Sequence, residues 1–320
     1  MAFNWAVIGS GVIAHRVLGE ITKTGRHRLC SVWSRNMDSA QKLAEKFGGR
    51  AYASLEEALA APGVQGAYIA TPNSAHISNA LGCLKAGVPV LCEKPAVLSA
   101  AQLSIILDAA ERADTYFCEG MWTRFMHVTQ AVRRAAESGE IGKIKSINLT
   151  LSYDRRFSGF SGRVTDPMAG GGALLDVGVY CAAYAVMLLG EPQSITSRSK
   201  LKGGVDMFTR ARLNYSGGAY ADITAGIDRL LPCRAVIKGE SGKITVPMFF
   251  KPVRARVIPE GGGAYTVRGQ RGFLPQFDKV AEDILSGKKQ SAEMPHTHSL
   301  AVMKILDECR RQAGIVYPGE

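Results

Sequence analysis

The fold of this chain is decided at its amino terminus, where residues 3–14 read FNWAVIGSGVIA. The apolar run at 3–8 predicts a β-strand, and the turn after it has the pattern G-x-G-x-x-A. In that pattern Gly9 makes a tight turn, Gly11 lets the backbone approach a pyrophosphate, and Ala14 allows close helix–sheet packing. The N-terminus of the following helix adds free N–H groups and partial positive charge. The segment therefore predicts a dinucleotide-binding loop.

The same alternation of strand and helix continues through the first part of the chain. Further strands are expected at 28–33, 66–70, 90–92 and 115–119, and helices at 12–24, 38–47, 75–86 and 99–113. Strands separated by helices of this length are typical of a doubly wound parallel sheet. We therefore expect an α/β fold that opens with a Rossmann domain over residues 1–123.

Residues 124–320 have a different pattern, in which β character dominates. A helix is expected at 126–138, another opens at Leu174, and two late helices cover 274–286 and 298–313. Strands are expected at 145–153, 193–201, 209–215, 218–227, 234–237, 243–246 and 254–258. Turn residues from Asn214 to Gly218 indicate a hairpin. The second domain, 124–320, is therefore predicted to be α+β with an open-faced, mainly antiparallel sheet.

Composition sets limits on the class of protein. The 320 residues are 46% hydrophobic and 21% charged, with a formal net charge of +11. Lys and Arg are dispersed along the chain without a nucleic-acid-binding motif, so we expect no nucleic-acid partner. We expect no membrane-spanning run, no secretory signal and a cytoplasmic location. Seven scattered cysteines without a CxxC pair predict buried, reduced thiols and no metal site.

The end of the second predicted strand bears on the choice of nucleotide. An NAD site normally has an acid about 20 residues beyond the fingerprint, where it binds the ribose 2′-OH. Here Ser34 and Arg35 occupy that region, and no acid follows before Asp38. A hydroxyl and a guanidinium suit a 2′-phosphate, so NADP(H) is favoured over NAD(H). Alternatively, Arg35 is only a solvated loop residue. The other contacts predicted within the loop are Ser10, Val12 and Ile13.

Two later segments should border the same site, because the carboxyl ends of parallel strands meet at one edge of a sheet. Thr71, Asn73 and His76 follow the strand at 66–70 and are expected to contact the cofactor. The alternative for this segment is capping of the next helix. Trp122 and Arg124 follow the strand at 115–119. Packing between domains and a surface ion pair are their alternatives.

Groups able to exchange protons occur in two places. Glu93 and Lys94, followed by a proline, come after a buried strand and are expected at the nicotinamide end of the site. Much later, a glycine triplet at 170–172 runs into LLDVGVY, which holds Asp176 and Tyr180. Residues four apart share one face of a helix, so the acid and the phenol should point the same way. An amphipathic helix with a core tyrosine is the alternative.

Together these motifs resemble the glucose–fructose oxidoreductase, inositol dehydrogenase and rhizopine-catabolism (Gfo/Idh/MocA) family over nearly the whole chain. The resemblance rests on the glycine fingerprint, the Glu93-Lys94-Pro95 motif and the Asp176-x-Gly178 helix. Many members have histidine four residues after that aspartate, where this chain has Tyr180. With tyrosine at this position, the chain resembles the branch of dimeric dihydrodiol dehydrogenases and NADP-linked xylose dehydrogenases.

The resemblance implies a specific chemistry. Lys94 and Tyr180 would share the acid/base work of hydride transfer, with Asp176 orienting Lys94 or a substrate hydroxyl. A free phenol has a pKa near 10, and a neighbouring ammonium favours its ionised form. The substrate would be a sugar, polyol or cyclic diol or carbonyl compound, and two copies would pair through the open sheet. Candidates for lining the substrate pocket are Arg155, Arg156, Phe157, Phe160 and Arg163.

Two other functions remain open at this point. The fold also occurs in non-catalytic regulators that sense NADP, although the three catalytic candidates argue against that role. A reductase of a non-sugar substrate could use the same acid/base residues, so a substrate screen is needed to separate it from a sugar dehydrogenase.

Overall fold

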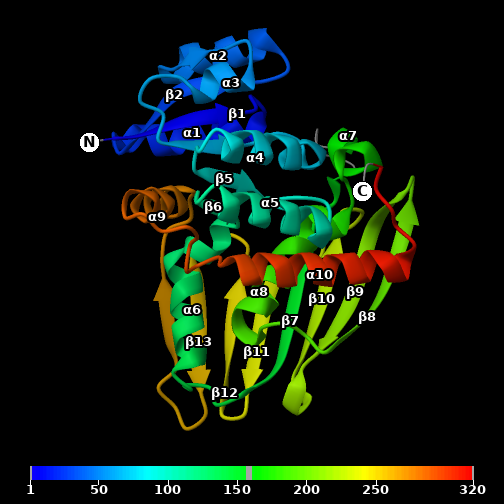
Figure 1. Cartoon of the computed structure of the whole chain (residues 1–320). Coiled ribbons are helices and arrows are strands. Elements are labelled where there is room, and N and C mark those ends of the chain that lie inside the picture. Colours follow the sequence, from blue (N-terminus) through cyan, green and yellow to red (C-terminus); the bar gives the residue numbers. More distant parts are fainter. Residues whose placement is uncertain (1, 156–160, 319–320) are drawn as a thin grey trace. The chain divides into compact units, whose positions relative to one another are not determined.

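The computed structural model describes residues 2–155 and 161–318. The chain divides into two compact units, each of which is described by itself (Figure 1). The first unit comprises Met1–Val97, Ala101–Trp122 and Gly272–His296, and the second comprises Leu98–Ala100, Thr123–Arg271 and Thr297–Glu320. The segment Gly272–His296 thus belongs to the first unit, although the sequence pattern assigned it to the second domain. It carries Phe277, whose ring packs edge-on against Trp5 and Tyr68.

The first unit is built on a six-stranded parallel sheet in the order β3-β2-β1-β4-β5-β6. Its strands are β1 (Phe3–Ile8), β2 (His27–Trp33), β3 (Arg50–Ala51), β4 (Gly66–Ile69), β5 (Val90–Glu93) and β6 (Phe117–Gly120). The helices are α1 (Val12–Ile21), η1 (Thr22–Thr24), α2 (Met37–Phe47), α3 (Leu55–Leu59), η2 (Asn73–Ala75), α4 (His76–Lys85), α5 (Ala100–Arg112) and α9 (Leu274–Leu285). This order is that of dinucleotide-binding domains, which confirms the predicted fold class.

Burial explains why polar and apolar residues do not alternate along these strands. All four residues of β4 are buried, as are the last four of β1, because helices cover both faces of a parallel sheet. The predicted close packing at Ala14 is also present, since its side chain is fully buried. The short elements β3 and α3 were not predicted, because two and five residues carry too little periodicity to detect.

The second unit contains an eight-stranded sheet in the order β14-β13-β12-β11-β7-β10-β9-β8. Its strands are β7 (Ile144–Ser152), β8 (Ser194–Lys202), β9 (Val205–Asn214), β10 (Tyr220–Gly226), β11 (Arg234–Gly239), β12 (Gly242–Pro247), β13 (Arg254–Pro259) and β14 (Tyr265–Arg268). Only the β7–β10 pair is parallel. The predicted α+β domain with a mainly antiparallel sheet is therefore confirmed.

Helices cover one face of this sheet, as Figure 1 shows for α6, α8 and α10. The helical segments are η3 (Trp122–Phe125), α6 (His127–Glu137), α7 (Ser161–Val164), η5 (Pro167–Ala169), η6 (Leu174–Gly178), α8 (Val179–Leu189), η7 (Ser216–Gly218) and α10 (His296–Ala313). Strand residues alternate accordingly: Ala211 and Leu213 of β9 are buried under the helices, whereas Arg210 and Arg212 are exposed. We call the opposite face of this sheet, which carries Arg210 and Arg212, the open face.

The expectation that no apolar run is long enough to span a bilayer is wrong. By length and composition, one stretch of the described chain, Pro167–Leu189, could do so. However, 83% of its apolar window is buried inside the fold, as in the core helix of a folded domain. The mean hydropathy of this stretch reflects its position against β7 and β10.

Candidate active site

The phosphate loop has the geometry that its glycines predict. Gly9 has a φ of +105°, and a Cβ there would lie 2.8 Å from both the carbonyl carbon and the oxygen of Ala70. Gly11 is the N-cap of α1, where no side chain caps the helix. Val12 in the first turn is 66% exposed. The helix start therefore offers accessible N–H groups, which suit a pyrophosphate.

The end of β2 lies next to this loop. The Ser10 Oγ donates to the Ser34 Oγ at 3.0 Å, and Ser34 in turn donates to the Asn36 carbonyl at 2.7 Å. Arg35 is exposed. Asn36 caps α2, with its Oδ1 accepting from the Ser39 N–H at 2.8 Å. A hydroxyl and a guanidinium thus follow the strand where a dinucleotide ribose would lie.

His76 is placed inside the first unit rather than on its surface. Its side chain is 1% exposed, with Nε2 lying 2.9 Å from the Thr71 carbonyl and Nδ1 2.9 Å from the Pro95 carbonyl. Asn73 is also buried, at the start of η2. The Thr71 hydroxyl accepts from Asn79 at 3.2 Å. His76 therefore connects the loop after β4 to the loop that carries Lys94.

A buried glutamate that the sequence did not single out holds the lysine loop from the other side. Glu119 is 1% exposed, and its Oε1 accepts from the Ala96 N–H at 3.1 Å. Glu93 accepts from the Tyr68 hydroxyl at 2.7 Å, and Lys94 is half-buried. The position of Glu119 near the end of a buried strand could have indicated this role, because a buried carboxyl group needs a hydrogen-bond partner.

Trp122 and Arg124 are each enclosed in their own unit. Trp122 is 7% exposed and stacks on Phe273, with ring centroids 4.6 Å apart. Arg124 is 1% exposed and donates to the His298 Nδ1 at 3.3 Å. Burial, with Arg124 and Arg133 nearby, lowers the pKa of His298 to about 4. The predicted contact of Trp122 and Arg124 with the cofactor stays a prediction.

The segment with Asp176 and Tyr180 begins with a π-helical turn, η6, which continues into α8. An α-helix was expected throughout, and the wider turn was not. Gly178 packs against β10, where a Cβ would lie 3.3 Å from that of Ala225. Single π turns of this kind occur frequently at functional sites.

Two arginines hold Asp176. Its side chain is 8% exposed, with Arg155 Nη2 at 3.4 Å from Oδ2 and Arg163 Nη2 at 3.2 Å from Oδ1. Both arginines are among the residues predicted to line the substrate pocket, but their pairing with Asp176 was not predicted. Arg156, Phe157 and Phe160, named with them, lie outside the described residues.

Tyr180 is half-buried beside an aromatic neighbour that the sequence did not indicate. Its ring packs edge-on against Phe250, with centroids 5.9 Å apart, and Tyr153 packs on the same ring at 5.7 Å. Lys251 Nζ lies 5.1 Å from the centroid of Phe250. Phe250 and Lys251 come from the connection between β12 and β13, and Tyr153 directly follows β7, so strand pairing brings these residues to Tyr180.

Packing within the second unit leaves no room for side chains at two glycines of the triplet. A Cβ on Gly172 would overlap Asp206 Oδ1. A Cβ on Gly171 would lie 2.7 Å from the Val164 carbonyl oxygen. Asp206, on β9, is fully buried and accepts from the Leu174 N–H at 2.9 Å and the Thr209 hydroxyl at 2.7 Å. It thus caps the helix that carries Asp176.

Asp206 should make the stability of the protein depend on pH. Burial raises the pKa of its carboxyl to about 6, so the native state holds a proton that the unfolded chain has lost between about pH 4 and 6. The contribution of Asp206 to the free energy of unfolding therefore falls as pH rises through this window, by about 3 kcal/mol. Urea unfolding of the wild type and Asp206→Asn should show this fall only in the wild type. Equal pH slopes in both would contradict it, and the exposed Asp38→Asn serves as control.

The structure assigns Lys94 to the first unit, and Asp176 and Tyr180 to the second.

All seven cysteines are free thiols, of which six are buried and Cys30 is half-buried. Across residues 2–155 and 161–318, no group of three or more His, Cys, Asp or Glu side chains is placed to hold a metal ion.

Comparison with known proteins agrees with these features. A model described as an oxidoreductase family with an NAD-binding Rossmann fold matches residues 3–121, and the GFO/IDH/MocA C-terminal domain matches residues 129–245. Trans-1,2-dihydrobenzene-1,2-diol dehydrogenase of Mus musculus is 30% identical, over 99% of each chain. D-xylose 1-dehydrogenase (NADP(+)) of Hypocrea jecorina is 27% identical, over 98% of this chain and 93% of its own.

A solved structure shows the same fold. The 3-ketoreductase KijD10 from Actinomadura kijaniata, in complex with NADP and TDP-benzene, has a TM-score of 0.87 and 22% identity, with 98% of each chain covered. The sheet order and the phosphate loop define a dinucleotide-binding Rossmann protein with an added α+β unit. This chain belongs to the Gfo/Idh/MocA oxidoreductase family, which confirms the resemblance inferred from its motifs.

Proposed function

We propose that this protein is an NADP(H)-dependent oxidoreductase that transfers a hydride between nicotinamide and a sugar, polyol or cyclic diol or carbonyl substrate. The observation that carries the proposal is a continuous helical segment in which the π turn η6 carries Asp176 and the apolar helix α8 carries Tyr180. The names of the dihydrodiol and xylose dehydrogenases among its relatives support the substrate class.

The dinucleotide fits the residues of the first unit. Gly9 and Gly11 form a cradle that side chains would fill, and the open start of α1 would hold the pyrophosphate. Ser34 and Arg35 would bind the 2′-phosphate, with Glu93 and Lys94 nearer the nicotinamide. When bound, the cofactor supplies or accepts the hydride.

Arg35→Ala should reduce the preference for NADP. A charged hydrogen bond is worth about 1.5–3 kcal/mol, so kcat/KM for NADP should fall about 10–100-fold while that for NAD changes by less than about threefold. Steady-state kinetics with both nucleotides measures the ratio. Arg28→Ala, which removes an exposed arginine of β2 away from the phosphate loop, is the control. An unchanged ratio in Arg35→Ala would overturn the NADP assignment.

The protein residues would handle the proton that accompanies hydride transfer. Tyr180 exchanges the proton of the reacting hydroxyl, as a general acid or base. The Lys94 ammonium favours the ionised phenol and hydrogen-bonds the reacting oxygen. Asp176, held by Arg155 and Arg163, orients Lys94 or a substrate hydroxyl. Lys94 belongs to the first unit, whereas Asp176 and Tyr180 belong to the second.

The two parts of the sequence would have different roles. We propose that residues 1–123 bind the dinucleotide and that residues 124–320 bind substrate and pair two copies through the open face. A sheet this broad exposes one side that a second copy could cover. We place the enzyme in the cytoplasm, where reduced thiols persist.

A substrate screen tests the function. Aldoses, polyols, cyclic diols and dicarbonyls would be incubated with NADP or NADPH, with nicotinamide absorbance as readout. Turnover of a sugar or diol is expected. Tight NADP binding without turnover of any compound would favour a regulator, and turnover of non-sugar carbonyls alone would favour the other reductase class.

A further inference from the structure

The open face of the eight-stranded sheet is strongly cationic. Strands β7 to β14 contain two acids, Asp206, which is buried under the helices, and Asp222, which lies on the open face. Strand registers place like charges directly opposite each other on that face in three pairs, which are Arg198–Arg210, Lys238–Lys243 and Arg254–Arg268. These cations are dispersed in the sequence, and strand pairing gathers them on one side.

Such pairs cost stability. Directly opposed Cβ atoms lie about 4.5–5.5 Å apart, and like charges there are destabilising. An anion bound between the two side chains would remove that repulsion. Guanidinium pairs match phosphate oxygens well, because each can make two parallel hydrogen bonds.

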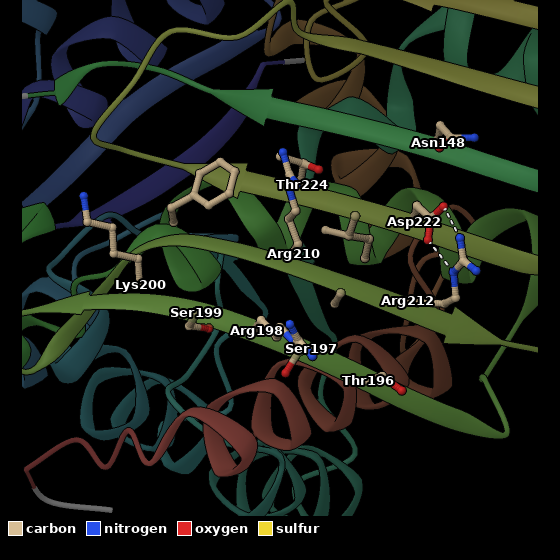
Figure 2. Close-up of a pocket in the computed structure, with 13 residues that line it drawn as sticks. Asn148, Thr196, Ser197, Arg198, Ser199, Lys200, Arg210, Arg212, Asp222 and Thr224 are labelled. Carbon is tan, nitrogen blue, oxygen red and sulfur yellow. Dashed lines mark hydrogen bonds and ion pairs between the residues drawn. The ribbon is translucent and has the colours of Figure 1, made fainter.

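One pair borders a hollow of about 800 Å³ at β8, β9 and β10 (Figure 2). Arg198 and Arg210 are both exposed there, and no described carboxylate lies within ion-pair distance of either. Arg212 is held by Asp222, with its Nε and Nη2 at 2.7 and 2.8 Å from the carboxylate oxygens. Thr196, Thr224 and Asn148 add hydroxyl and amide groups to the lining.

We propose that this hollow binds a small multivalent anion of the phosphate class, such as pyrophosphate or a phosphate ester, between Arg198 and Arg210. The two guanidiniums supply the charge, and Thr196 and Thr224 are hydrogen-bond donors at the rim. The Arg212–Asp222 pair fixes one wall, and Lys200 is held by Asp228 at 3.3 Å. Arg198 and Arg210, whose guanidinium carbon lies 5.4 Å from the centroid of the Phe208 ring, are the cations that would bind the ligand.

The anion would also affect self-association. Two open faces that meet bring like charges together, and a bound anion between them reduces the repulsion. This consequence rests on the pairing proposed above, whereas the anion site itself does not.

Isothermal titration calorimetry with pyrophosphate, at constant ionic strength, tests the site. Kd is expected to rise at least about tenfold in Arg198→Gln/Arg210→Gln, since two charged hydrogen-bonding groups are lost. Arg256→Gln, on the same face outside the hollow, is the control and should stay within about twofold. The double variant should melt no lower than the wild type without pyrophosphate, because a repulsive pair is removed.

Three results would overturn the proposal. They are no binding to the wild type, equal Kd in the wild type and the double variant, and equal weakening by Arg256→Gln. Oligonucleotide binding that all three substitutions reduce alike would instead indicate a diffuse polyanion surface, which also contradicts a local site. Sedimentation velocity with pyrophosphate separates the two proposals: binding by a protein that stays monomeric supports the site and contradicts the pairing.

Discussion

Tyr180→Phe is expected to slow single-turnover hydride transfer by about 10²–10⁴-fold, the range that loss of a positioned general acid or base produces. The phenyl ring retains the edge-on contact with Phe250, so the fold and NADP binding should be preserved. Rapid mixing of the enzyme–NADP complex with substrate measures the chemical step apart from product release.

Tyr184→Phe is the matched control for this variant. Tyr184 lies one turn further along α8, is 1% exposed and packs edge-on against Phe249. Loss of its hydroxyl should change the rate by less than about threefold. Near wild-type hydride transfer in Tyr180→Phe would show that the tyrosine is a packing residue.

Lys94→Met is expected to have an effect of similar size, about 10²–10⁴-fold on the same step. Methionine keeps most of the length of the side chain but removes the ammonium that stabilises the ionised phenol and the reacting oxygen. His76 and Glu119 hold the loop through its backbone, so the loop itself should persist.

The measurement pairs hydride transfer with NADP affinity. The dissociation constant for NADP should change by less than about tenfold, because the phosphate loop and Arg35 are untouched. Lys85→Met, at the end of α4, is the control for loss of a lysine charge elsewhere in the first unit. Loss of NADP binding with an unchanged transfer rate would assign Lys94 to the cofactor alone.

Local sequence signals predicted the first unit well. The glycines, the alternating strands and the acid-free end of β2 each depend on residues close together in the chain. The π turn was not predicted, and within it Gly178 packs against Ala225, a residue of β10 that is distant in the sequence. Gly172 likewise packs against Asp206, which comes from β9.

Contacts across the second sheet could not be predicted for the same reason. Pairing of Arg163 with Asp176, and of Phe250 with Tyr180, depends on the path of loops between strands. The cationic open face shows the effect most clearly. Arg198 and Arg210 are twelve residues apart in sequence, and only the β8–β9 register places them opposite each other.

The central claim is that Lys94 and Tyr180 act on one reacting oxygen, although they belong to different units. A double-mutant cycle on single-turnover hydride transfer tests this most directly. When two groups act together in one catalytic step, the effects of their substitutions on the rate are strongly non-additive. Hydride transfer in Lys94→Met/Tyr180→Phe should therefore be no more than about tenfold slower than in the slower single variant. A double variant in which the two rate losses multiply would contradict a shared site.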